Sequence, residues 1–155
     1  MNRALFLDRD GTINVDSGYS YKIDEFKFVV GAPELIKKYN ELSYKIIVVT
    51  NQSGIARNIF SEIDMHKLHS HINSLLSKIH AHVDAFYFCP HHPDFTGECS
   101  CRKPKPGMLL QAAMDLDIDL SGSILIGDKD SDIEAGVAAG VGTLIKNVTN
   151  REVKL

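Results

Sequence analysis

Short apolar runs alternate along this chain with longer amphipathic segments, and this alternation restricts the possible folds more than any other feature. The runs Ile46–Val49 and Ile124–Ile126 are apolar throughout, as expected of strands that are covered on both faces. We predict strands at Arg3–Asp8, Lys45–Thr50, Val83–Cys89, Ser123–Gly127 and Thr143–Lys146. We predict helices at Ala32–Leu42, Ser61–Ile79, Pro106–Leu116 and Asp130–Ala139. Alternating strands and helices with right-handed crossovers predict an α/β fold with a doubly wound parallel sheet.

The helix over Ser61–Ile79 has the strongest local support. Ser61 and Asp64 form a Ser-x-x-Asp pattern that predicts a capping box at its start. Apolar residues then recur at helical spacing, at Leu68, Ile72, Leu75, Leu76 and Ile79. The helix over Asp130–Ala139 is predicted to end at Gly140, because glycine commonly ends a helix in the left-handed conformation.

Length and composition set the broad class of the protein. A chain of 155 residues is expected to form one domain, over residues 1–155. The formal net charge is -3 and there is no run of Lys or Arg, so we expect no nucleic-acid partner. No apolar stretch has membrane-spanning length, and residues 1–3 lead directly into the first predicted strand without a signal-peptide pattern. We therefore expect a cytoplasmic protein with no membrane partner.

Two carboxylates follow the first predicted strand. The apolar run Ala4–Leu7 is followed by Asp8, Asp10 and then Gly11. Ligands bind at the carboxyl ends of strands in open α/β sheets, and residues i and i+2 of an extended segment point to the same side. Two close carboxylates repel each other unless one is protonated or a cation lies between them. The pair therefore predicts a metal site, proton chemistry or both, and the alternative is a capped turn.

Later strand ends carry residues that fit the same chemistry. Thr50–Gly54 offers a hydroxyl and a turn of small residues that can bind phosphate, although Thr-Asn before a helix is also a common cap. Gly127–Asp132 carries three more acids. Between these segments lies a proline-rich turn with three cations, Arg102, Lys103 and Lys105. Together the segments predict an anion-binding metal site at one edge of the sheet.

The three cysteines lie in one short loop that also contains histidine. The candidate metal ligands are Cys89, Cys99, Cys101 and either His91 or His92. Three thiolates and one imidazole suffice for a closed tetrahedral zinc site. A disulfide would leave one thiol over and is disfavoured in the cytosol. Because four protein ligands leave no open position, we interpret the zinc as structural, fixing the adjacent Arg102 and Lys103.

The remaining histidines carry no metal-binding pattern. No carboxylate spacing accompanies them, and a solvated helix face or a strand edge is the commoner position for such residues. We therefore assign no role to His66, His69, His71, His80 and His82.

These motifs occur in the order found in a known superfamily. Asp8-x-Asp10-Gly-Thr, Thr50, Lys103 and Asp128 resemble the four motifs of the haloacid dehalogenase superfamily of phosphatases, over nearly the whole chain. Residues 8–16, 50–57, 89–93 and 101–104 are similar to the D-glycero-D-manno-heptose-1,7-bisphosphate 7-phosphatases. The histidinol-phosphatases, a sister group, share the zinc loop, in which the family pattern favours His91. The resemblance implies a Rossmann-like haloacid dehalogenase fold, and the motif spacing leaves no room for a separate cap domain.

The resemblance also implies catalytic roles. Asp8 would attack phosphorus and form an aspartyl-phosphate, and Asp10 would protonate the leaving oxygen and then deprotonate water. Mg²⁺ would be held by Asp8, the main-chain carbonyl of Asp10 and Asp128. Thr50 and Lys103 would bind the transferring phosphoryl oxygens.

Other residues are expected to surround the substrate. We predict substrate contacts from Asp16, Ser17, Gly18, Tyr19, Asn51, Gln52, Ser53, Arg102 and Lys129. For the loop residues the alternative is an ordinary polar loop. With the lysine role implied for Lys103, Lys105 is expected to be a solvated turn residue. Asp132 either orients metal-bound water or caps the next helix, and both remain open.

The predicted partner is a small phosphorylated sugar, and we expect a monomer. The heptose bisphosphate ranks before histidinol phosphate because residues 14–19 and 53–57 are more similar to the heptose group. A non-catalytic receiver-like module is a distant alternative. Receiver domains carry their acceptor aspartate after the third strand, where this chain has Cys89-Pro90.

Overall fold

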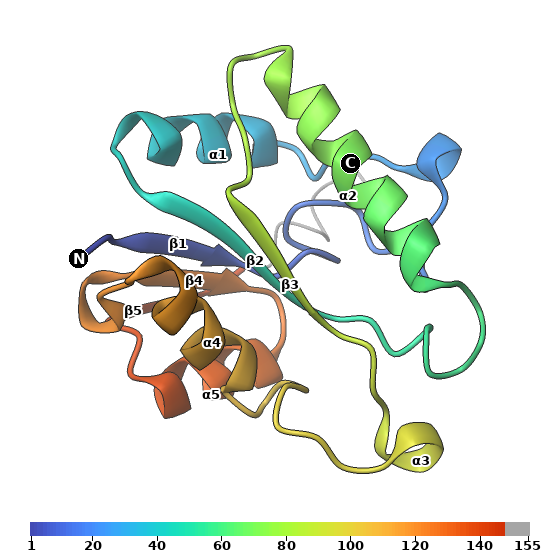
Figure 1. The fold of residues 1–155 in the computed structure, drawn as a ribbon. Helices are drawn as coiled ribbons and strands as arrows, with labels where there is room; N and C mark the ends of the chain where they lie inside the picture. Colours follow the sequence, from blue (N-terminus) through green and yellow to red (C-terminus); the bar gives the residue numbers. More distant parts are fainter. Residues whose placement is uncertain (148–155) are drawn as a thin grey trace.

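The computed structural model describes residues 1–147, and the strands in this range form one sheet (Figure 1). The strands are β1 (Ala4–Leu7), β2 (Lys45–Asn51), β3 (Ala85–Cys89), β4 (Ile124–Gly127) and β5 (Thr143–Lys146). All are parallel, in the order β3-β2-β1-β4-β5, with Leu5 opposite Ile46 on one side and Ile124 on the other. The predicted doubly wound parallel sheet is confirmed. Because every strand runs the same way, all five carboxyl ends lie along one edge.

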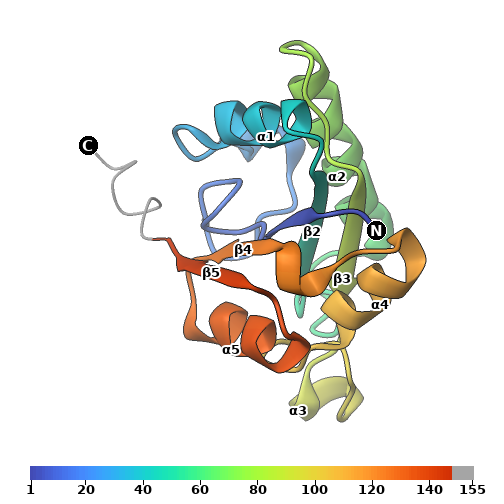
Figure 2. The ribbon, with the colours of Figure 1, turned by 90° about the vertical axis from the view of Figure 1, so that its left-hand side faces the viewer.

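Helices cover both faces of the sheet (Figures 1 and 2). They are α1 (Ala32–Glu41), α2 (Glu62–Ser77), α3 (Pro93–Thr96), α4 (Gly107–Leu116) and α5 (Asp130–Ala139). α1 and α2 lie on one face, α4 and α5 lie on the other, and the short α3 lies apart from both layers. None of the helices in residues 1–147 combines the length and the apolar character needed to cross a bilayer.

Successive strand residues point to opposite faces, so the sheet separates two hydrophobic cores. Leu5 of β1 packs in the core that contains Ile36 of α1 and Leu68 of α2. Phe6, the next residue along β1, packs in the core that contains Leu109 of α4. Each such side chain contributes about 1.5–3 kcal/mol when it is fully buried. Burial on both faces explains why β1, β2 and β4 are apolar at every central position.

The local helix signals are confirmed. Ser61 Oγ accepts from the Asp64 N–H at 3.1 Å, and the Asp64 carboxylate accepts from the Ser61 N–H at 3.0 Å, which completes the capping box. Gly140, with φ of 85°, ends α5 in the left-handed conformation. α2 ends at Ser77, two residues before the predicted end, because the chain turns at His80, whose φ is 62°.

Short elements escaped prediction. Residues 14–29 lie between the predicted strands and helices, but an antiparallel bridge joins Asn14 to Phe28, and a 3-10 helix, η1, spans Ile23–Glu25. The loop after β3 contains α3, and a second 3-10 helix, η2, spans Leu120–Gly122 before β4. These segments are too short to show a hydrophobic period, so a sequence pattern does not identify them.

Candidate active site

Asp8 and Lys103 meet at the carboxyl end of β1. The Lys103 ammonium donates hydrogen bonds to Asp8 Oδ1 at 2.9 Å, to the Val49 carbonyl at 2.8 Å and to Asp132 Oδ1 at 2.5 Å. The side chains of Asp8, Lys103 and Asp132 are 7%, 4% and 4% exposed, so the three charges are buried together. Burial by itself lowers the pKa of Lys103, but the two carboxylates outweigh burial and raise the pKa above its ordinary value. The lysine therefore remains a cation beside Asp8.

Main-chain contacts decide which lysine enters the site. Asn51 Oδ1 accepts from the Lys103 N–H at 3.0 Å, and Asn51 Nδ2 donates to the Lys103 carbonyl at 3.2 Å. Lys105 is half-exposed and donates instead to Glu98 at 2.8 Å. The structure thus places Lys103, rather than Lys105, against Asp8. The Asn51 amide, predicted to contact substrate, is engaged with the Lys103 main chain.

Four hydrogen bonds from side chains hold the Asp10 carboxylate. Oδ1 accepts from Arg9 Nε at 3.0 Å, from Arg9 Nη2 at 2.9 Å and from Asn14 Nδ2 at 3.0 Å. Oδ2 accepts from Gln52 Nε2 at 3.2 Å, and the same amide group donates to Thr50 Oγ1 at 2.9 Å. Gln52 therefore joins the carboxylate after β1 to the hydroxyl at the end of β2.

Asp128, after β4, completes a group of three carboxylates. Oxygen atoms of Asp8, Asp128 and Asp132 lie within 4.8 Å of one another. Burial and then the neighbouring Asp8 charge raise the pKa of Asp128 to about 7. Asp128 Oδ1 is buried and has no hydrogen-bond partner in residues 1–147. Crowded carboxylates with a free oxygen fit a hard divalent cation such as Mg²⁺. The Asp10 side chain lies outside this group. The Mg²⁺ ligand that the family resemblance implies for Asp10 would therefore be its main-chain carbonyl.

Gly11 permits this close approach of the first and fourth strand ends. Its φ is +89°, a conformation that L side chains rarely adopt. A Cβ at this position would also collide with Asp128 Oδ2. Glycine is therefore required here both by the turn and by the adjacent carboxylate.

A cleft of about 610 Å³ opens beside these groups. It is lined by Asp10, Asp16, Gly18, Tyr19, Asn51, Gln52, Ser53, Gly54, Arg102, Lys103, Pro104, Lys129 and Ser131. The lining contains every residue predicted to contact substrate except Ser17. The Ser17 hydroxyl instead lies 3.1 Å from the Ser20 hydroxyl, within its own loop. Asp8 is buried next to the cleft, in contact with the lining residue Lys103.

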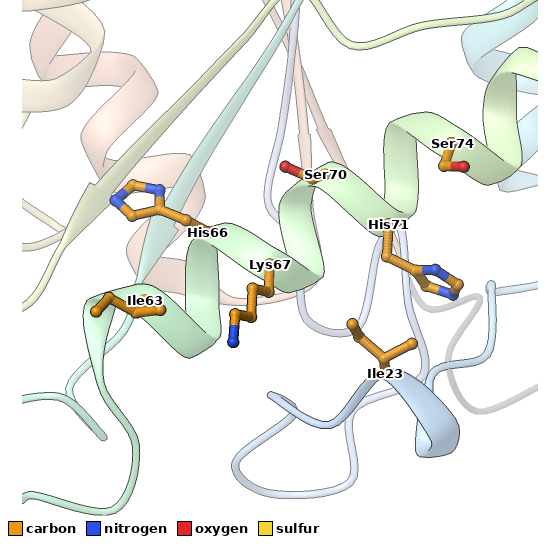
Figure 3. A pocket seen from close by; sticks show the side chains of 7 residues that line it. All are labelled: Ile23, Ile63, His66, Lys67, Ser70, His71 and Ser74. Atoms are coloured by element: carbon orange, nitrogen blue, oxygen red, sulfur yellow. The ribbon is translucent and has the colours of Figure 1, made fainter.

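A second depression, of about 550 Å³, runs along the outer face of α2 (Figure 3). It is lined by Ile23, Ile63, His66, Lys67, Ser70, His71 and Ser74. This lining shares no residue with the cleft and contains no carboxylate. The catalytic chemistry therefore belongs to the cleft.

The three cysteine sulfurs gather after β3. The Sγ atoms of Cys89, Cys99 and Cys101 lie within 4.8 Å of one another. Cys89 and Cys101 are paired as a disulfide with Cα atoms 5.6 Å apart, an arrangement that the sequence analysis disfavoured. The pairing is possible because the loop returns Cys101 to the end of β3. The Cys99 sulfur, unpaired, lies 3.6 Å from that of Cys89, close to the separation of about 3.8 Å between two sulfurs on a tetrahedral zinc ion.

Neither candidate histidine joins this sulfur group within residues 1–147. The main-chain carbonyl of His91 accepts from Arg102 Nη1 at 3.3 Å. The ring of His92 accepts from the Asp94 N–H at 3.1 Å and lies 3.2 Å from Arg57 Nη2. The structure therefore brings together the three predicted thiol ligands without the fourth ligand.

Sequence reasoning missed a buried arginine and its partner. Arg9 is 0% exposed, its Nη1 lies 3.1 Å from His69 Nε2, and its Nη2 donates to the Ser20 carbonyl at 2.5 Å. His69, which was assigned no role, is buried and stacks on Phe86 with ring centroids 4.2 Å apart. Burial and then the Arg9 charge lower the pKa of His69 to about 3. The sequence did carry a signal for this contact. Arg9 is a cation between Asp8 and Asp10 at the end of a buried strand, and a cation in such a position requires buried partners.

The site defines a class of enzyme. A carboxylate that is paired with a buried ammonium lies next to a second carboxylate on a cleft, and Arg102 and Lys129 add cations to the cleft wall. A cationic cleft with convergent carboxylates at the strand ends suits phosphoryl transfer to a carboxylate.

The comparisons with known proteins agree with this class. Residues 4–150 match the family described as polynucleotide kinase 3 phosphatase. A D-glycero-beta-D-manno-heptose-1,7-bisphosphate 7-phosphatase of Yersinia pestis is 44% identical over 97% of this chain and 82% of its own length. A D-glycero-alpha-D-manno-heptose-1,7-bisphosphate 7-phosphatase of Burkholderia mallei is 48% identical over 93% of this chain and 79% of its own length.

A solved structure gives the same result. The D,D-heptose 1,7-bisphosphate phosphatase of B. bronchiseptica, complexed with magnesium and phosphate, superposes with a TM-score of 0.87. It is 33% identical, and the match covers 98% of this chain and 85% of that one. The chain belongs to the polynucleotide kinase 3 phosphatase family of the haloacid dehalogenase superfamily, together with the heptose-bisphosphate phosphatases. It is a phosphatase, a hydrolase of phosphomonoesters.

Proposed function

We propose that this protein removes the 7-phosphate of D-glycero-D-manno-heptose 1,7-bisphosphate through an aspartyl-phosphate on Asp8. The observation that carries the proposal is the pairing of Asp8 with the buried Lys103, beside an Asp10 carboxylate that lines the cleft. The names of the relatives support the substrate, and the magnesium in the B. bronchiseptica complex supports the cofactor.

In the first step an Asp8 oxygen attacks phosphorus. An acyl-phosphate bond forms, the phosphorus–oxygen bond to the sugar breaks, and its electron pair stays on the sugar oxygen. Asp10 gives a proton to that oxygen, so the product leaves as an alcohol. Lys103 offsets charge on the phosphoryl oxygens, and Thr50, held through Gln52, is placed to donate its hydroxyl hydrogen to them.

In the second step Asp10, now ionised, takes a proton from water as the water oxygen attacks the acyl-phosphate. The bond between phosphorus and Asp8 breaks, and inorganic phosphate leaves. Mg²⁺ held by Asp8, Asp128 and the Asp10 carbonyl would reduce the repulsion between the anionic nucleophile and the anionic phosphate. Asp132, which contacts Lys103 at 2.5 Å and accepts from the Lys129 N–H at 3.1 Å, orients the lysine and also caps α5.

The cleft wall supports a substrate with two anionic groups. Arg102 and Lys129 lie on the cleft in addition to Lys103, so a second phosphate has cationic partners away from the reacting one. Histidinol phosphate carries one phosphate and a cationic amine, for which these two residues offer no attraction. The heptose bisphosphate is therefore the better match.

We place a structural zinc on Cys89, Cys99 and Cys101 in their reduced state, in which the pair Cys89–Cys101 is open, with His91 as the fourth ligand after a local rearrangement of its ring. The spacing of the sulfurs supports this site, and the reduced thiols that it needs are typical of the cytoplasm. We propose a single domain over residues 1–155, active as a monomer, because the cleft is built from one chain.

Phosphate release tests the function. We expect turnover of both anomers of heptose 1,7-bisphosphate, with one preferred, and at least about tenfold lower kcat/KM for histidinol phosphate and for hexose 6-phosphates. Product analysis by ³¹P NMR should show loss of the 7-phosphate and retention of the 1-phosphate. Equal kcat/KM across the panel would contradict the substrate assignment, and loss of the 1-phosphate would contradict the regiochemistry.

A further inference from the structure

The orientation of Asp10 is set by residues outside the catalytic group. We propose that Arg9, held by His69, is a positioning residue that turns Asp10 Oδ2 toward the leaving oxygen and fixes the adjacent loop at Ser20. This inference rests on the proposed function, because it assigns an acid role to Asp10.

The two oxygens of Asp10 have unequal surroundings. Oδ1 already accepts three N–H groups, two of them from the Arg9 guanidinium at 3.0 and 2.9 Å. Oδ2 accepts one, from the Gln52 amide at 3.2 Å. A carboxylate oxygen with three donors has no remaining lone-pair direction, whereas Oδ2 retains capacity. Because Asp10 and Gln52 both line the cleft, Oδ2 is the oxygen available to substrate.

His69 supplies the acceptor that keeps Arg9 in place. A guanidinium only donates hydrogen bonds, so the 3.1 Å contact with Arg9 Nη1 requires an unprotonated Nε2 and a proton on Nδ1 of His69. The imidazole is itself fixed, because it is 4% exposed on α2 and stacks on Phe86 of β3 with an interplanar angle of 10°. Arg9 is thus connected to two elements of the packed core.

Arg9 also connects Asp10 to the wall of the cleft. Its Nη2 atom donates both to Asp10 Oδ1 and to the Ser20 carbonyl. Ser20 directly follows Tyr19, which lines the cleft. A single buried cation therefore orients the acid and the loop that contacts substrate, so one displacement disturbs both.

The step affected is cleavage of the phosphorus–oxygen bond. Asp10 Oδ2 passes its proton to the bridging oxygen, which keeps the electron pair of the broken bond and leaves as the sugar hydroxyl. An alkyl leaving group needs this proton, whereas 4-nitrophenolate leaves without it. A displaced Asp10 should therefore impair hydrolysis of a sugar phosphate far more than hydrolysis of 4-nitrophenyl phosphate.

The test compares four variants on these two substrates. His69→Phe keeps the stacked ring and removes the acceptor, whereas His69→Gln keeps an acceptor. His66→Phe is the matched control, because His66 is an exposed histidine on the same helix. Asp10→Asn defines the result of complete loss of the acid.

We expect His69→Phe to lower kcat for heptose bisphosphate by about 10–100-fold, a part of the roughly 10²–10⁴-fold that general acid catalysis supplies. Its kcat for 4-nitrophenyl phosphate should fall by less than about threefold, and KM for both substrates should change little. His69→Gln and His66→Phe should stay within about threefold of the parent on both. Equal loss of kcat on the two substrates in His69→Phe would overturn the proposal.

A measurement without turnover separates this inference from the proposed function. Long-range ¹H–¹⁵N spectra of the parent should show His69 as the neutral Nδ1–H tautomer at pH 7. An Nε2–H tautomer or an imidazolium would exclude the contact with Arg9 and overturn the proposal. If the sugar phosphates are not hydrolysed by the parent, the proposed function fails, while this result still decides the Arg9–His69 contact.

Discussion

Two regions at the same edge of the sheet are stabilised in different ways. The carboxylate site at β1 and β4 is buried, and the charged groups of Asp8, Lys103 and Asp132 are paired with one another. The cysteine loop after β3 is largely exposed, and α3 within it contains no buried residue. The carboxylate site is therefore stabilised by buried charge pairs, whereas the cysteine loop is held by the contacts between its sulfurs and by more exposed hydrogen bonds, such as those from Arg102 to the His91 carbonyl and from Lys105 to the Cys99 carbonyl.

The difference shows where a metal is needed for order. Strand ends of the sheet fix the positions of the carboxylates, so Mg²⁺ there can exchange without loss of structure. In the loop, zinc or a disulfide replaces the missing core, as in other small segments that lack one. Asn51 links the two regions, because it lies at the end of β2 and binds the Lys103 main chain just after the cysteines.

Removing the nucleophile should have the largest effect and should leave both regions folded. Asp8→Asn should lower kcat by about 10⁴-fold or more, because the amide is a poor nucleophile of nearly the same shape. Circular dichroism and zinc content should match the parent. A phosphorylated residue other than Asp8 in trapped parent enzyme would contradict the assignment.

Two lysines allow the regions to be compared directly. Lys103→Met should abolish activity and lower the free energy of unfolding by about 3–5 kcal/mol, because Asp8 and Asp132 remain buried without their cation. Lys105→Met removes an exposed pair with Glu98 and an exposed hydrogen bond to the Cys99 carbonyl, and should shift the urea midpoint far less than Lys103→Met does. Similar midpoints for the two variants would contradict the contrast between a buried and an exposed site.

Metal removal should affect the metal sites of the two regions differently. Brief EDTA treatment should stop activity, and Mg²⁺ alone should restore it while elemental analysis still finds about one zinc per chain, because closed thiolate sites exchange slowly. Cys101→Ser should lose zinc and lower activity by about tenfold without altering a Mg²⁺ ligand. Zinc-free protein with full activity would exclude the structural zinc, and rescue by Zn²⁺ but not Mg²⁺ would reverse the two assignments.

The link between the regions can be broken at one residue. Asn51→Ala removes both hydrogen bonds to the Lys103 main chain and should lower kcat by about 5–30-fold, the equivalent of one to two net hydrogen bonds. Ser53→Ala, on the same turn and on the cleft wall, is the control for an effect on substrate binding and should alter KM more than kcat. An effect of Asn51→Ala confined to KM would favour the original prediction of a substrate contact.

The smallest expected effect is a pH dependence of stability. The pKa of His69 is lowered from 6.5 to about 3 in the folded protein, so between these values the unfolded chain binds more protons. Stability from this group is complete above pH 6.5 and is lost as pH falls toward 3. His69→Gln should therefore lose less stability than the parent between pH 6.5 and pH 4.5 in urea titrations. Parallel losses in the two proteins would show that His69 is not buried in its neutral form.

Much of the site could be predicted because its residues are adjacent to strand ends. Asp8, Thr50 and Asp128 each follow or end an apolar run, and a parallel sheet brings such positions to one edge. The capping box at Ser61 and the end of α5 at Gly140 were predicted for a similar reason, since both depend on local backbone bonds.

Contacts between distant segments could not be predicted in the same way. The pairing of Asn51 with Lys103, and of Arg9 with His69, joins residues 52 and 60 positions apart. No period or motif encodes which side chain lies opposite another across two elements. Three further outcomes depended on loop conformation, which has no such period. They are the contact of Ser17 with Ser20 instead of the cleft, the absence of a histidine from the sulfur group in residues 1–147, and the pairing of Cys89 with Cys101.

The sequence by itself determined which local features follow one another along the chain: the apolar runs, the acids that follow them, and the cation-rich turn. These are local properties, because hydrophobic periodicity and turn chemistry act within a few residues. Only the tertiary structure decided that Lys103 is buried between Asp8 and Asp132, and that Oδ2 of Asp10 accepts one hydrogen bond where Oδ1 accepts three. Those outcomes depend on burial, since a charge removed from water must find its partners wherever the packed elements place them.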